Sequence, residues 1–489
     1  MTAATRPHLA ADGAGLAGLV GGRVVVAGRM AVRGAAVDSR LVSDRPGCIF
    51  FALPGERTDG RLHAAAALEA GAAAVIYAPG GGASIDAAIG AAAAVAMSRG
   101  ASLVEVADPL AALATAARAW RATLEIEVIG ITGSVGKTST KELTIAALGG
   151  ERAHCAATPG NANNEIGLPL ALLNLPDDTE RFVAEMGMYV PGDIASLCAI
   201  ARPSIGVVTA VDAVHASRAG GLDAIEQGKG ELVAALPADG WAILAVDDPR
   251  VARMAARGPA RVLTAGASVG SDIRILGARL DETRARTTVR LATPEGEIEA
   301  SLPAFGLHFA RAAALALATA RACGVPLELA ARQMEAATLP AGRASIHAAG
   351  GVRIIDDAYN AAPTSMAAAL ATLGACAGRR FAALGPMGEL GDLAEAAHLE
   401  IGRAAAETGL ELLVVLGADA DGIAEGARLA GMPIERILRL PGDEAGLDAA
   451  AGMLGDRARS GDTILVKASR ASQLERLVSR LLARFGAAA

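Results

Sequence analysis

Lysine is nearly absent from this chain of 489 residues. Only Lys137, Lys141, Lys229 and Lys467 occur, against a combined total of 45 Lys and Arg. Since arginine supplies positive charge almost everywhere, each remaining lysine is a candidate for chemistry that a guanidinium group performs poorly. Aromatic residues are scarce as well, at 2% of the chain. The cores must therefore be built from Val, Leu, Ile and Ala in layers of sheet and helix.

An excess of positive charge, long apolar segments and paired cysteines are also missing. The net charge of −7, with no basic patch between aromatics, argues against a nucleic-acid partner. No signal peptide is recognised, and apolar stretches such as 87–97 are too short for membrane insertion. The odd number of cysteines and the lack of CxxC spacing favour reduced thiols in a cytoplasmic protein, which we expect to be a monomer. The cysteines are Cys48, Cys155, Cys198, Cys323 and Cys376.

The order of apolar and Ala-rich segments predicts an α/β protein of three domains. Short apolar runs between helical stretches predict a small α/β domain over residues 1–124. Alternating strands and helices predict a central parallel-sheet domain over 125–337, with short antiparallel strands within 272–303. The alternation resumes over 338–489, which predicts a Rossmann-like domain. No GxGxxG follows the first strand of this last domain, so a dinucleotide is not indicated.

Residues 130–140 read Gly-Ile-Thr-Gly-Ser-Val-Gly-Lys-Thr-Ser-Thr. The apolar run before them and the helix-like stretch after them predict a strand, a glycine turn and a helix start. In such a phosphate-binding loop, backbone N–H groups and a lysine contact phosphate, and a threonine holds Mg²⁺. Ile131 stands where the strict Walker pattern has glycine. A Gly-rich turn that binds nothing is the alternative.

Two more predicted strands end in, or are followed by, side chains that could bind a metal ion. Glu185 lies in the apolar run 181–186, and His215 follows the run 205–211. The carboxyl ends of parallel strands form the ligand edge of a sheet, where oxygen ligands can hold Mg²⁺ beside phosphates. Taken singly, an exposed glutamate and a structural histidine are the plainer interpretations.

Asparagine is clustered. The chain has five, and three of them, Asn161, Asn163 and Asn164, lie within Thr158–Pro169. Clustered asparagines are typical of turns. The alternative is a polar lip over the phosphate loop that grips an amide or a sugar.

Lys229 lies in a predicted helix over 222–236, between Glu226 and Glu231. A solvated helix lysine is the plain interpretation. The scarcity of lysine favours a primary amine that reacts with CO₂, because the carbamate formed carries a carboxylate able to bind Mg²⁺.

Arg343 and the run Asp356–Pro363 open the third domain. A strand that ends in Asp-Asp, followed by Tyr359 and Asn360 and a Pro-started helix, predicts another strand-end ligand site. A capped turn is the alternative.

Together these residues resemble the Mur ligase family nearly from end to end. Residues 37–40 and 50–60 look like its UDP-sugar-binding first domain, 132–138 like its ATP loop, and 158–169 like its Thr-Pro-Gly-Asn stretch. Residues 356–360, 386–391 and 466–470 look like its C-terminal motifs. The Tyr-Asn pair after Asp-Asp is most similar to the member that adds D-alanyl-D-alanine.

The resemblance implies an ATP-dependent ligase of peptidoglycan precursor synthesis. ATP would phosphorylate the terminal carboxylate of UDP-MurNAc-tripeptide, and the amine of D-Ala-D-Ala would attack the acyl phosphate. The implied ATP-binding residues are Thr132, Gly133, Ser134, Val135, Gly136, Lys137, Thr138, Asp357, Tyr359 and Asn360. The implied Mg²⁺ ligands are Thr138, Glu185, His215 and carbamoylated Lys229. The implied catalytic residues are Lys137, His215, Lys229 and Arg343, and the implied substrate contacts are Ser39, Arg40, Thr158, Asn161 and Asn163.

The chain also departs from the family pattern. Ala245, Ala312 and Ala362 stand near positions where the family usually has asparagine, so adenine contacts are expected to be weaker or differently built. Two alternatives therefore stay open. One is a sibling ligase that adds another amino acid, and the other is an inactive nucleotide-binding scaffold. The sequence does not distinguish lysine from diaminopimelate at the third position of the tripeptide.

Overall fold

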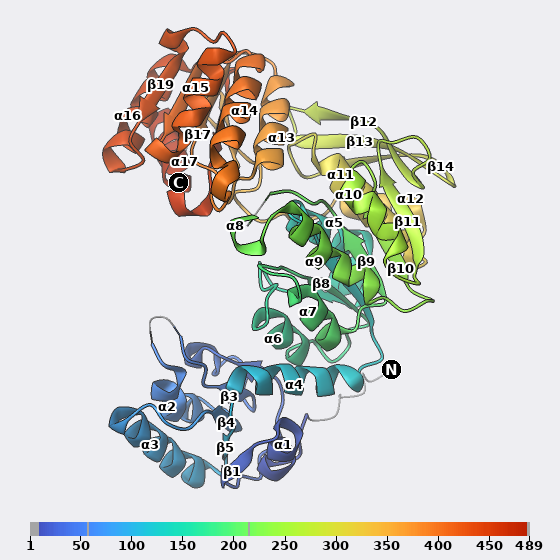
Figure 1. The fold of residues 1–489 in the computed structure, drawn as a ribbon, viewed down its shortest axis with the longest axis vertical. Helices are drawn as coiled ribbons and strands as arrows, with labels where there is room; N and C mark the ends of the chain where they lie inside the picture. Colours follow the sequence, from blue (N-terminus) through green and yellow to red (C-terminus); the bar gives the residue numbers. More distant parts are fainter. Residues whose placement is uncertain (1–8, 56–57, 214–215, 487–489) are drawn as a thin grey trace. The chain divides into compact units, whose positions relative to one another are not determined.

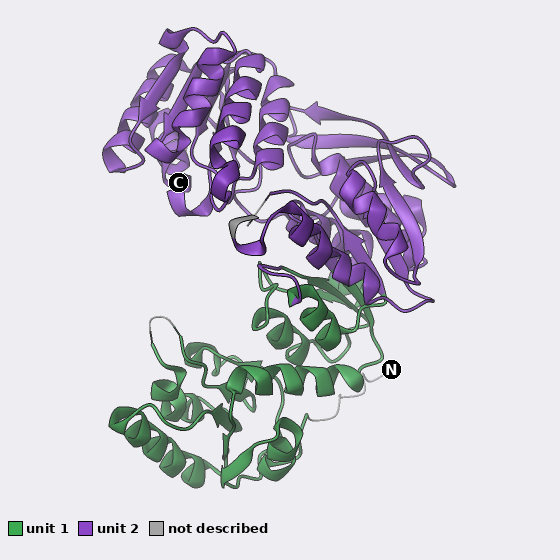
Figure 2. Cartoon of the chain, in the orientation of Figure 1, with its two compact units in different colours: residues 1–130, 151–187, 193–204 green, residues 131–150, 188–192, 205–489 purple. Residues whose placement is uncertain are grey.

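The structure is a computed structural model that describes residues 9–55, 58–213 and 216–486. The chain divides into two compact units (Figure 2). The first contains residues 1–130, 151–187 and 193–204, and the second contains residues 131–150, 188–192 and 205–489. Of the described helices, none is both long and apolar enough to cross a lipid bilayer.

The N-terminal part of the first unit is built on a five-stranded sheet of order β1-β5-β4-β3-β2. Its strands pair in parallel except β1, which is antiparallel to β5. The elements, most of which are labelled in Figure 1, are α1 (Gly13–Val20), β1 (Arg23–Val26), β2 (Ala35–Ala36), η1 (Ser39–Leu41), β3 (Ile49–Phe51), η2 (Gly60–His63), α2 (Ala64–Glu69), β4 (Ala74–Tyr77), α3 (Ala83–Arg99), β5 (Ser102–Glu105) and α4 (Pro109–Ala122).

The central sheet has nine strands in the order β14-β13-β12-β11-β10-β9-β6-β8-β7. The pairs β7–β8, β9–β10, β10–β11 and β11–β12 are parallel, and the hairpins β12–β13 and β13–β14 add an antiparallel extension. The elements are β6 (Glu127–Thr132), α5 (Lys137–Ala147), η3 (Gly150–Ala153), β7 (Cys155–Ala157), α6 (Gly167–Leu173), β8 (Arg181–Glu185), α7 (Asp193–Ala201), β9 (Ile205–Val208), α8 (Ala216–Ala219), α9 (Leu222–Ala234), β10 (Trp241–Ala245), α10 (Pro249–Ala252), η4 (Arg253–Ala256), β11 (Arg261–Gly266), β12 (Ile273–Asp281), β13 (Arg286–Thr293), β14 (Gly296–Leu302), α11 (Phe309–Ala322) and α12 (Leu327–Met334).

The C-terminal part of the second unit carries a six-stranded sheet of order β15-β16-β20-β17-β18-β19. Only β15 is antiparallel to its neighbour. The elements are β15 (Ser345–Ala349), β16 (Val352–Asp356), α13 (Pro363–Gly374), β17 (Arg380–Leu384), η5 (Gly391–Leu393), α14 (Ala394–Glu407), β18 (Leu412–Leu416), η6 (Ala418–Ala420), α15 (Asp421–Leu429), η7 (Ile434–Arg436), β19 (Ile437–Leu440), α16 (Glu444–Arg457), β20 (Thr463–Lys467), η8 (Arg470–Ser472) and α17 (Glu475–Phe485).

The three sheets confirm the predicted α/β class. Two local expectations were wrong. The strand predicted over 205–211 ends at Val208, because the next residues bond to the phosphate loop and to an aspartate side chain instead of extending the ladder. The edge strand β15 was not predicted, since its sequence Ser-Ile-His-Ala-Ala has no marked alternation. The domain boundaries at 124 and 337 stay a prediction.

The cores consist mainly of aliphatic side chains, as the composition predicts. Helix α11 is buried over most of its surface, with Leu315 and Leu317 fully enclosed among alanines. Most of the phenylalanines are buried, including Phe182 in β8 and Phe381 in β17. Two lysines, Lys141 and Lys467, are also among the largest fully buried side chains. Burying an ammonium group is costly unless it is paired, so each of these lysines needs a physical reason.

Asn174 joins the N-terminal sheet to helix α6 within the first unit. Its side-chain oxygen accepts from the Ala35 N–H at 3.0 Å, and its amide nitrogen donates to the Ala35 carbonyl at 2.9 Å. The same nitrogen donates to the carbonyl of Leu170 at 2.8 Å. Asn174 therefore bonds both backbone groups of Ala35 in β2, a strand of only two residues at the edge of its sheet.

Replacing Asn174 with alanine should destabilise the first unit by about 1–3 kcal/mol, because the buried Ala35 backbone groups lose their partners. Urea unfolding followed by circular dichroism measures the change. Asn161→Ala removes an exposed asparagine and should stay within about 0.5 kcal/mol of the parent. Equal stability of the two variants would contradict the role given to Asn174.

Candidate active site

The predicted phosphate loop is present between β6 and α5. Gly136 has φ +82° and precedes the first residue of α5, and no side chain caps this helix start. Lys137 folds back over the loop, where its Nζ donates to the carbonyls of Gly133 at 2.6 Å and Ser134 at 3.3 Å. Thr138 is buried at the start of the helix. The lysine and the helix start therefore have the arrangement that binds phosphate.

The loop is held against the end of β9. The Thr209 N–H donates to the Thr132 carbonyl at 3.0 Å, and the Ser134 N–H donates to the Ala210 carbonyl at 2.8 Å. The Thr209 hydroxyl donates to the Val135 carbonyl at 2.5 Å. Thr209 passes so close that a Cβ on Gly133 would lie 1.9 Å from its Oγ1. Glycine at 133 is therefore required by contact as well as by its φ of +148°.

Glu185 ends β8 and is buried, with 2% of its surface exposed. Its Oε1 accepts from the Asn163 side-chain amide at 2.8 Å, and its backbone N–H donates to the Thr158 hydroxyl at 3.0 Å. The interpretation as an exposed strand-end glutamate is thus wrong.

The asparagine cluster divides by role. Asn163 orients Glu185, whereas Asn164 closes the turn before α6 by accepting from the Gly167 N–H at 2.9 Å. Asn161 is exposed. Of the predicted substrate contacts, Asn163 therefore bonds the carboxylate of Glu185 and Thr158 bonds its backbone N–H.

Lys229 lies in α9 and is 4% exposed. Burial, together with the positive charge of Lys137, holds the pKa of Lys229 well below its ordinary value. The interpretation as a solvated helix lysine is wrong. A lowered pKa favours the neutral amine, which is the form that acts as a nucleophile. His215 lies outside the described residues.

The strand-end site predicted in the third domain is assembled around Asp357. Its Oδ2 accepts from Lys467 Nζ at 2.6 Å, and its Oδ1 accepts from the Ala344 N–H at 3.2 Å. Lys467 also donates to the carbonyl of Asn360 at 3.0 Å. This buried lysine thus fixes the segment that carries Asp357, Tyr359 and Asn360.

Arg343 packs against the same segment, with its guanidinium carbon 4.4 Å from the centre of the Tyr359 ring. The guanidinium of Arg470 lies 5.8 Å from that centre. Two cations therefore gather around one aromatic ring, beside a carboxylate that is already neutralised by Lys467.

Asp212 joins the phosphate loop to the same region. Its backbone carbonyl accepts from the Ser134 hydroxyl at 3.0 Å, and its N–H donates to that hydroxyl oxygen at 2.9 Å. Its carboxylate accepts from the Thr364 N–H in the first turn of α13 at 3.2 Å. Because Ala362 before this helix has no polar side chain, Asp212 supplies the carboxylate that favours a helix N-terminus.

The predicted substrate residues Ser39 and Arg40 lie at η1 of the first unit. Arg40 is largely exposed, and its guanidinium forms two-pronged hydrogen bonds with Asp38 at 2.9 and 2.6 Å. This contact lowers the pKa of Asp38 to about 2, mainly through the side-chain hydrogen bond. The guanidinium is therefore held in place by the carboxylate two residues before it.

Three residues near the predicted site were missed or given no role from the sequence. The sequence indicates no contact for Lys467 and no role for Asp212, because their partners lie far away along the chain. His308 is partly buried, and its desolvation lowers its pKa to about 4 while the Asp357 carboxylate opposes the shift. Its Nδ1 has no hydrogen-bond partner among the described residues.

Models of known protein families match most of this sequence. The description "Mur ligase family, catalytic domain" matches residues 31–121, "Mur ligase middle domain" matches 131–320, and "Mur ligase, glutamate ligase domain" matches 342–470. This chain belongs to the Mur ligase family. The expected resemblance is thereby confirmed, and the fold is that of an ATP-dependent ligase.

Individual Mur ligases are similar over nearly their whole length. The UDP-N-acetylmuramoyl-tripeptide–D-alanyl-D-alanine ligase of Mycobacterium bovis is 38% identical, with 91% of each chain covered. The Bacillus subtilis ligase of that name is 32% identical, over 92% of this chain and 93% of the relative.

Solved structures of the same family agree. A crystal structure of MurF from Acinetobacter baumannii is 27% identical with a TM-score of 0.84, covering 98% of this chain and 99% of the other. MurF from Thermotoga maritima in complex with ADP is 27% identical with a TM-score of 0.79, covering 93% and 98%.

Replacing Gly133 with alanine should weaken ATP binding by about 10- to 100-fold, since the new Cβ forces Thr209 and the loop apart at a cost of about 1–3 kcal/mol. Isothermal titration with a non-hydrolysable ATP analogue measures the affinity. Gly90→Ala in α3, where nothing lies within 4 Å of the added Cβ, should bind as the parent does. An unchanged affinity of Gly133→Ala would show that the contact yields without affecting the loop.

Proposed function

We propose that this chain joins D-alanyl-D-alanine to UDP-MurNAc-tripeptide with the hydrolysis of ATP, in peptidoglycan precursor synthesis. The observation that carries the proposal is the match over about nine-tenths of the chain to relatives named for this reaction. The complete phosphate loop and the buried Glu185 and Lys229 support an active enzyme over an inactive scaffold. We further propose that it acts in the cytoplasm as three domains, 1–124, 125–337 and 338–489.

The reaction has two steps. A carboxylate oxygen of the tripeptide attacks the γ-phosphorus, the bond to the β-phosphate oxygen breaks, and ADP leaves. The amine of D-Ala-D-Ala then attacks the acyl carbon of the acyl phosphate, loses a proton, and expels inorganic phosphate as the amide forms. Carboxylate and γ-phosphate are both negative, so the first step depends on neutralising and positioning them.

The phosphate-loop residues suit this task. The nucleotide phosphates lie on the backbone of Thr132–Thr138, and Lys137 exchanges its bonds to the Gly133 and Ser134 carbonyls for phosphate oxygens. Arg343 adds positive charge from the third domain, and Asp357 accepts from the ribose hydroxyls, with Tyr359 and Asn360 beside it. Ser39, Arg40 and Asn161 contact the UDP-sugar substrate. These roles are proposals that rest on the motif positions and on the hydrogen bonds described above.

The metal assignment is also a proposal. Glu185 offers a buried carboxylate and Thr138 a buried hydroxyl, the oxygen ligands that Mg²⁺ prefers. Among the described residues no three His, Cys, Asp or Glu side chains gather as a metal site, so the set needs His215 and a carboxylate on Lys229. Mg²⁺ bound by these groups would neutralise the γ-phosphate and the substrate carboxylate.

The carboxylate on Lys229 would come from CO₂. The neutral amine attacks the carbon of CO₂, an N–C bond forms, and one proton is released, which leaves a carbamate of charge −1. The burial of Lys229 and its low pKa fit this reaction, because an ammonium group has no lone pair with which to attack.

Product analysis tests the function. The purified chain, ATP, Mg²⁺ and D-Ala-D-Ala should convert both the lysine and the diaminopimelate form of UDP-MurNAc-tripeptide, or one of them, to the pentapeptide detected by mass spectrometry. Single amino acids should give no product. Product with a single amino acid but not with D-Ala-D-Ala would identify a sibling ligase, and intact UDP-sugar binding without any product would identify an inactive scaffold.

Lys229→Ala should lower kcat by about 100-fold or more, as expected for a lost ligand of a catalytic metal. Added acetate or formate should restore part of the activity by replacing the carbamate carboxylate. The measurement is ADP release at saturating substrates. Full activity of Lys229→Arg, which cannot form the carbamate, would contradict the proposed modification.

A further inference from the structure

Lys229 occupies a weak point of its helix. It lies between Gly228 and Gly230, and glycine is unfavourable in a helix interior because it loses the most backbone freedom on folding. Both glycines pack closely against long side chains. A Cβ on Gly228 would lie 2.5 Å from Cε of Met188, and a Cβ on Gly230 would lie 2.6 Å from Cδ of Arg257. Helix α9 is thus closely packed on two sides where its own backbone is least stable.

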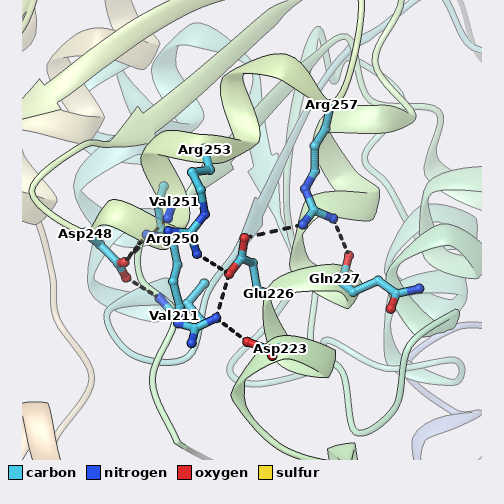
Figure 3. A network of polar contacts seen from close by, with 9 residues as sticks. All are labelled: Val211, Asp223, Glu226, Gln227, Asp248, Arg250, Val251, Arg253 and Arg257. Atoms are coloured by element: carbon cyan, nitrogen blue, oxygen red, sulfur yellow. Dashed lines mark hydrogen bonds and ion pairs between the residues drawn. The ribbon is translucent and has the colours of Figure 1, made fainter.

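One turn before Lys229, Glu226 ties α9 to the next helical segment. Its Oε2 accepts from Arg250 at 2.7 Å and from Arg253 at 2.8 Å, and its Oε1 accepts from Arg257 at 3.5 Å (Figure 3). The Glu226 side chain is 10% exposed, and the arginines are 30–59% exposed. A buried carboxylate with three guanidinium partners has little freedom to move, because each displacement lengthens several charge-assisted hydrogen bonds.

Arg250 lies in α10, Arg253 begins η4 and Arg257 directly follows η4, and this segment is anchored in turn. Asp248 caps α10 by accepting from the Arg250 N–H at 2.9 Å, and its other oxygen accepts from the Val211 N–H at 2.7 Å (Figure 3). Val211 directly follows Ala210, whose carbonyl accepts from Ser134 of the phosphate loop. Hydrogen bonds and the backbone from Ala210 to Val211 therefore connect the phosphate loop, through Asp248 and Arg250, to Glu226.

A second glutamate fixes the other side of α9. Glu231, two residues after Lys229, accepts from the Gly192 N–H at 2.6 Å. Lys229 is thus held by a contact before it and a contact after it. The contact before it is the one linked by hydrogen bonds to the phosphate loop.

We propose that Glu226 is a positioning residue for the ligase reaction. Through Arg250, Arg253 and Arg257 it sets the place of α9, and hence the distance of the Lys229 amine from the phosphate loop. Glu226 does not touch substrate. The inference rests on the proposed function, because it assumes that Lys229 takes part in catalysis.

The experiment compares Glu226→Gln with a matched control. Glutamine keeps the shape but removes the charge that holds the three arginines. Glu425→Gln is the control, because Glu425 of α15 also pairs with two arginines, Arg428 at 2.7 Å and Arg439 at 3.8 Å. Helix α15 contains no lysine. Kinetics of ADP release and thermal unfolding are measured for each full-length variant, with all assays run well below the unfolding transition.

For Glu226→Gln we expect kcat to fall about 10- to 100-fold, as displacement of a catalytic group by about 1 Å does. The KM for ATP should stay within about twofold, because the phosphate loop itself is unchanged. Glu425→Gln should keep both constants. A Glu226→Gln enzyme with parental kcat would overturn the proposal, even if its melting temperature fell, since a purely structural role predicts that result.

Arg253→Met provides a second measurement should Glu226→Gln fail to fold. Arg253 is 59% exposed and contributes one arm of the contact, so the variant should fold and lose about threefold in kcat. Unchanged kcat in Arg253→Met would then overturn the proposal. Failure of the proposed function is recognised separately, because the parent enzyme would then form no pentapeptide, whatever the variants do.

Discussion

The backbone hydrogen bonds between the phosphate loop and the end of β9 are the constraint on which the second unit depends. They stop β9 at Val208 and turn the next residues toward the loop. Three features follow from this turn. Glycine is forced at 133, Asp212 reaches both Ser134 and α13, and the Val211 N–H is left for Asp248. Hydrogen bonds to the loop, in place of further sheet hydrogen bonds, thereby position residues that contact the starts of α10 and α13.

The charged side chains differ in how deeply they are buried. The arginines lie mostly at surfaces, where they pair with carboxylates in water and contribute little stability individually. Glu226 differs from these, since its carboxylate is enclosed and removing one partner of such a group leaves the other uncompensated. Lys467 with Asp357 is the corresponding pair in the C-terminal part. Glu226 lies one turn before Lys229, and Lys467 contacts Asp357 and Asn360. These buried ionic contacts therefore hold residues to which we assign roles in the reaction.

The parts of the site that depend on short sequence spacing could be predicted. The phosphate loop and the strand-end position of Glu185 follow from a strand, a turn and the side of the sheet where parallel strands end. The scarcity of lysine singled out Lys229 for special chemistry, and the structure shows that this side chain is buried. Contacts between distant segments could not be predicted, because no local pattern records them. Glu226 with its arginines, Lys467 with Asp357, and Asp212 with Thr364 each join residues that only the fold brings together.

The near absence of lysine has a consequence for the reactivity of the whole surface. Lys141, Lys229 and Lys467 are each less than 5% exposed, and Lys137 is half-buried over the phosphate loop. Apart from the α-amino group, the outer surface therefore offers almost no primary amine to acylating reagents, aldehydes or sugars. The lysine amine most open to such reagents is that of Lys137, so covalent amine chemistry on this protein would be directed to the loop between β6 and α5. A nucleotide bound there, as we propose, would block it.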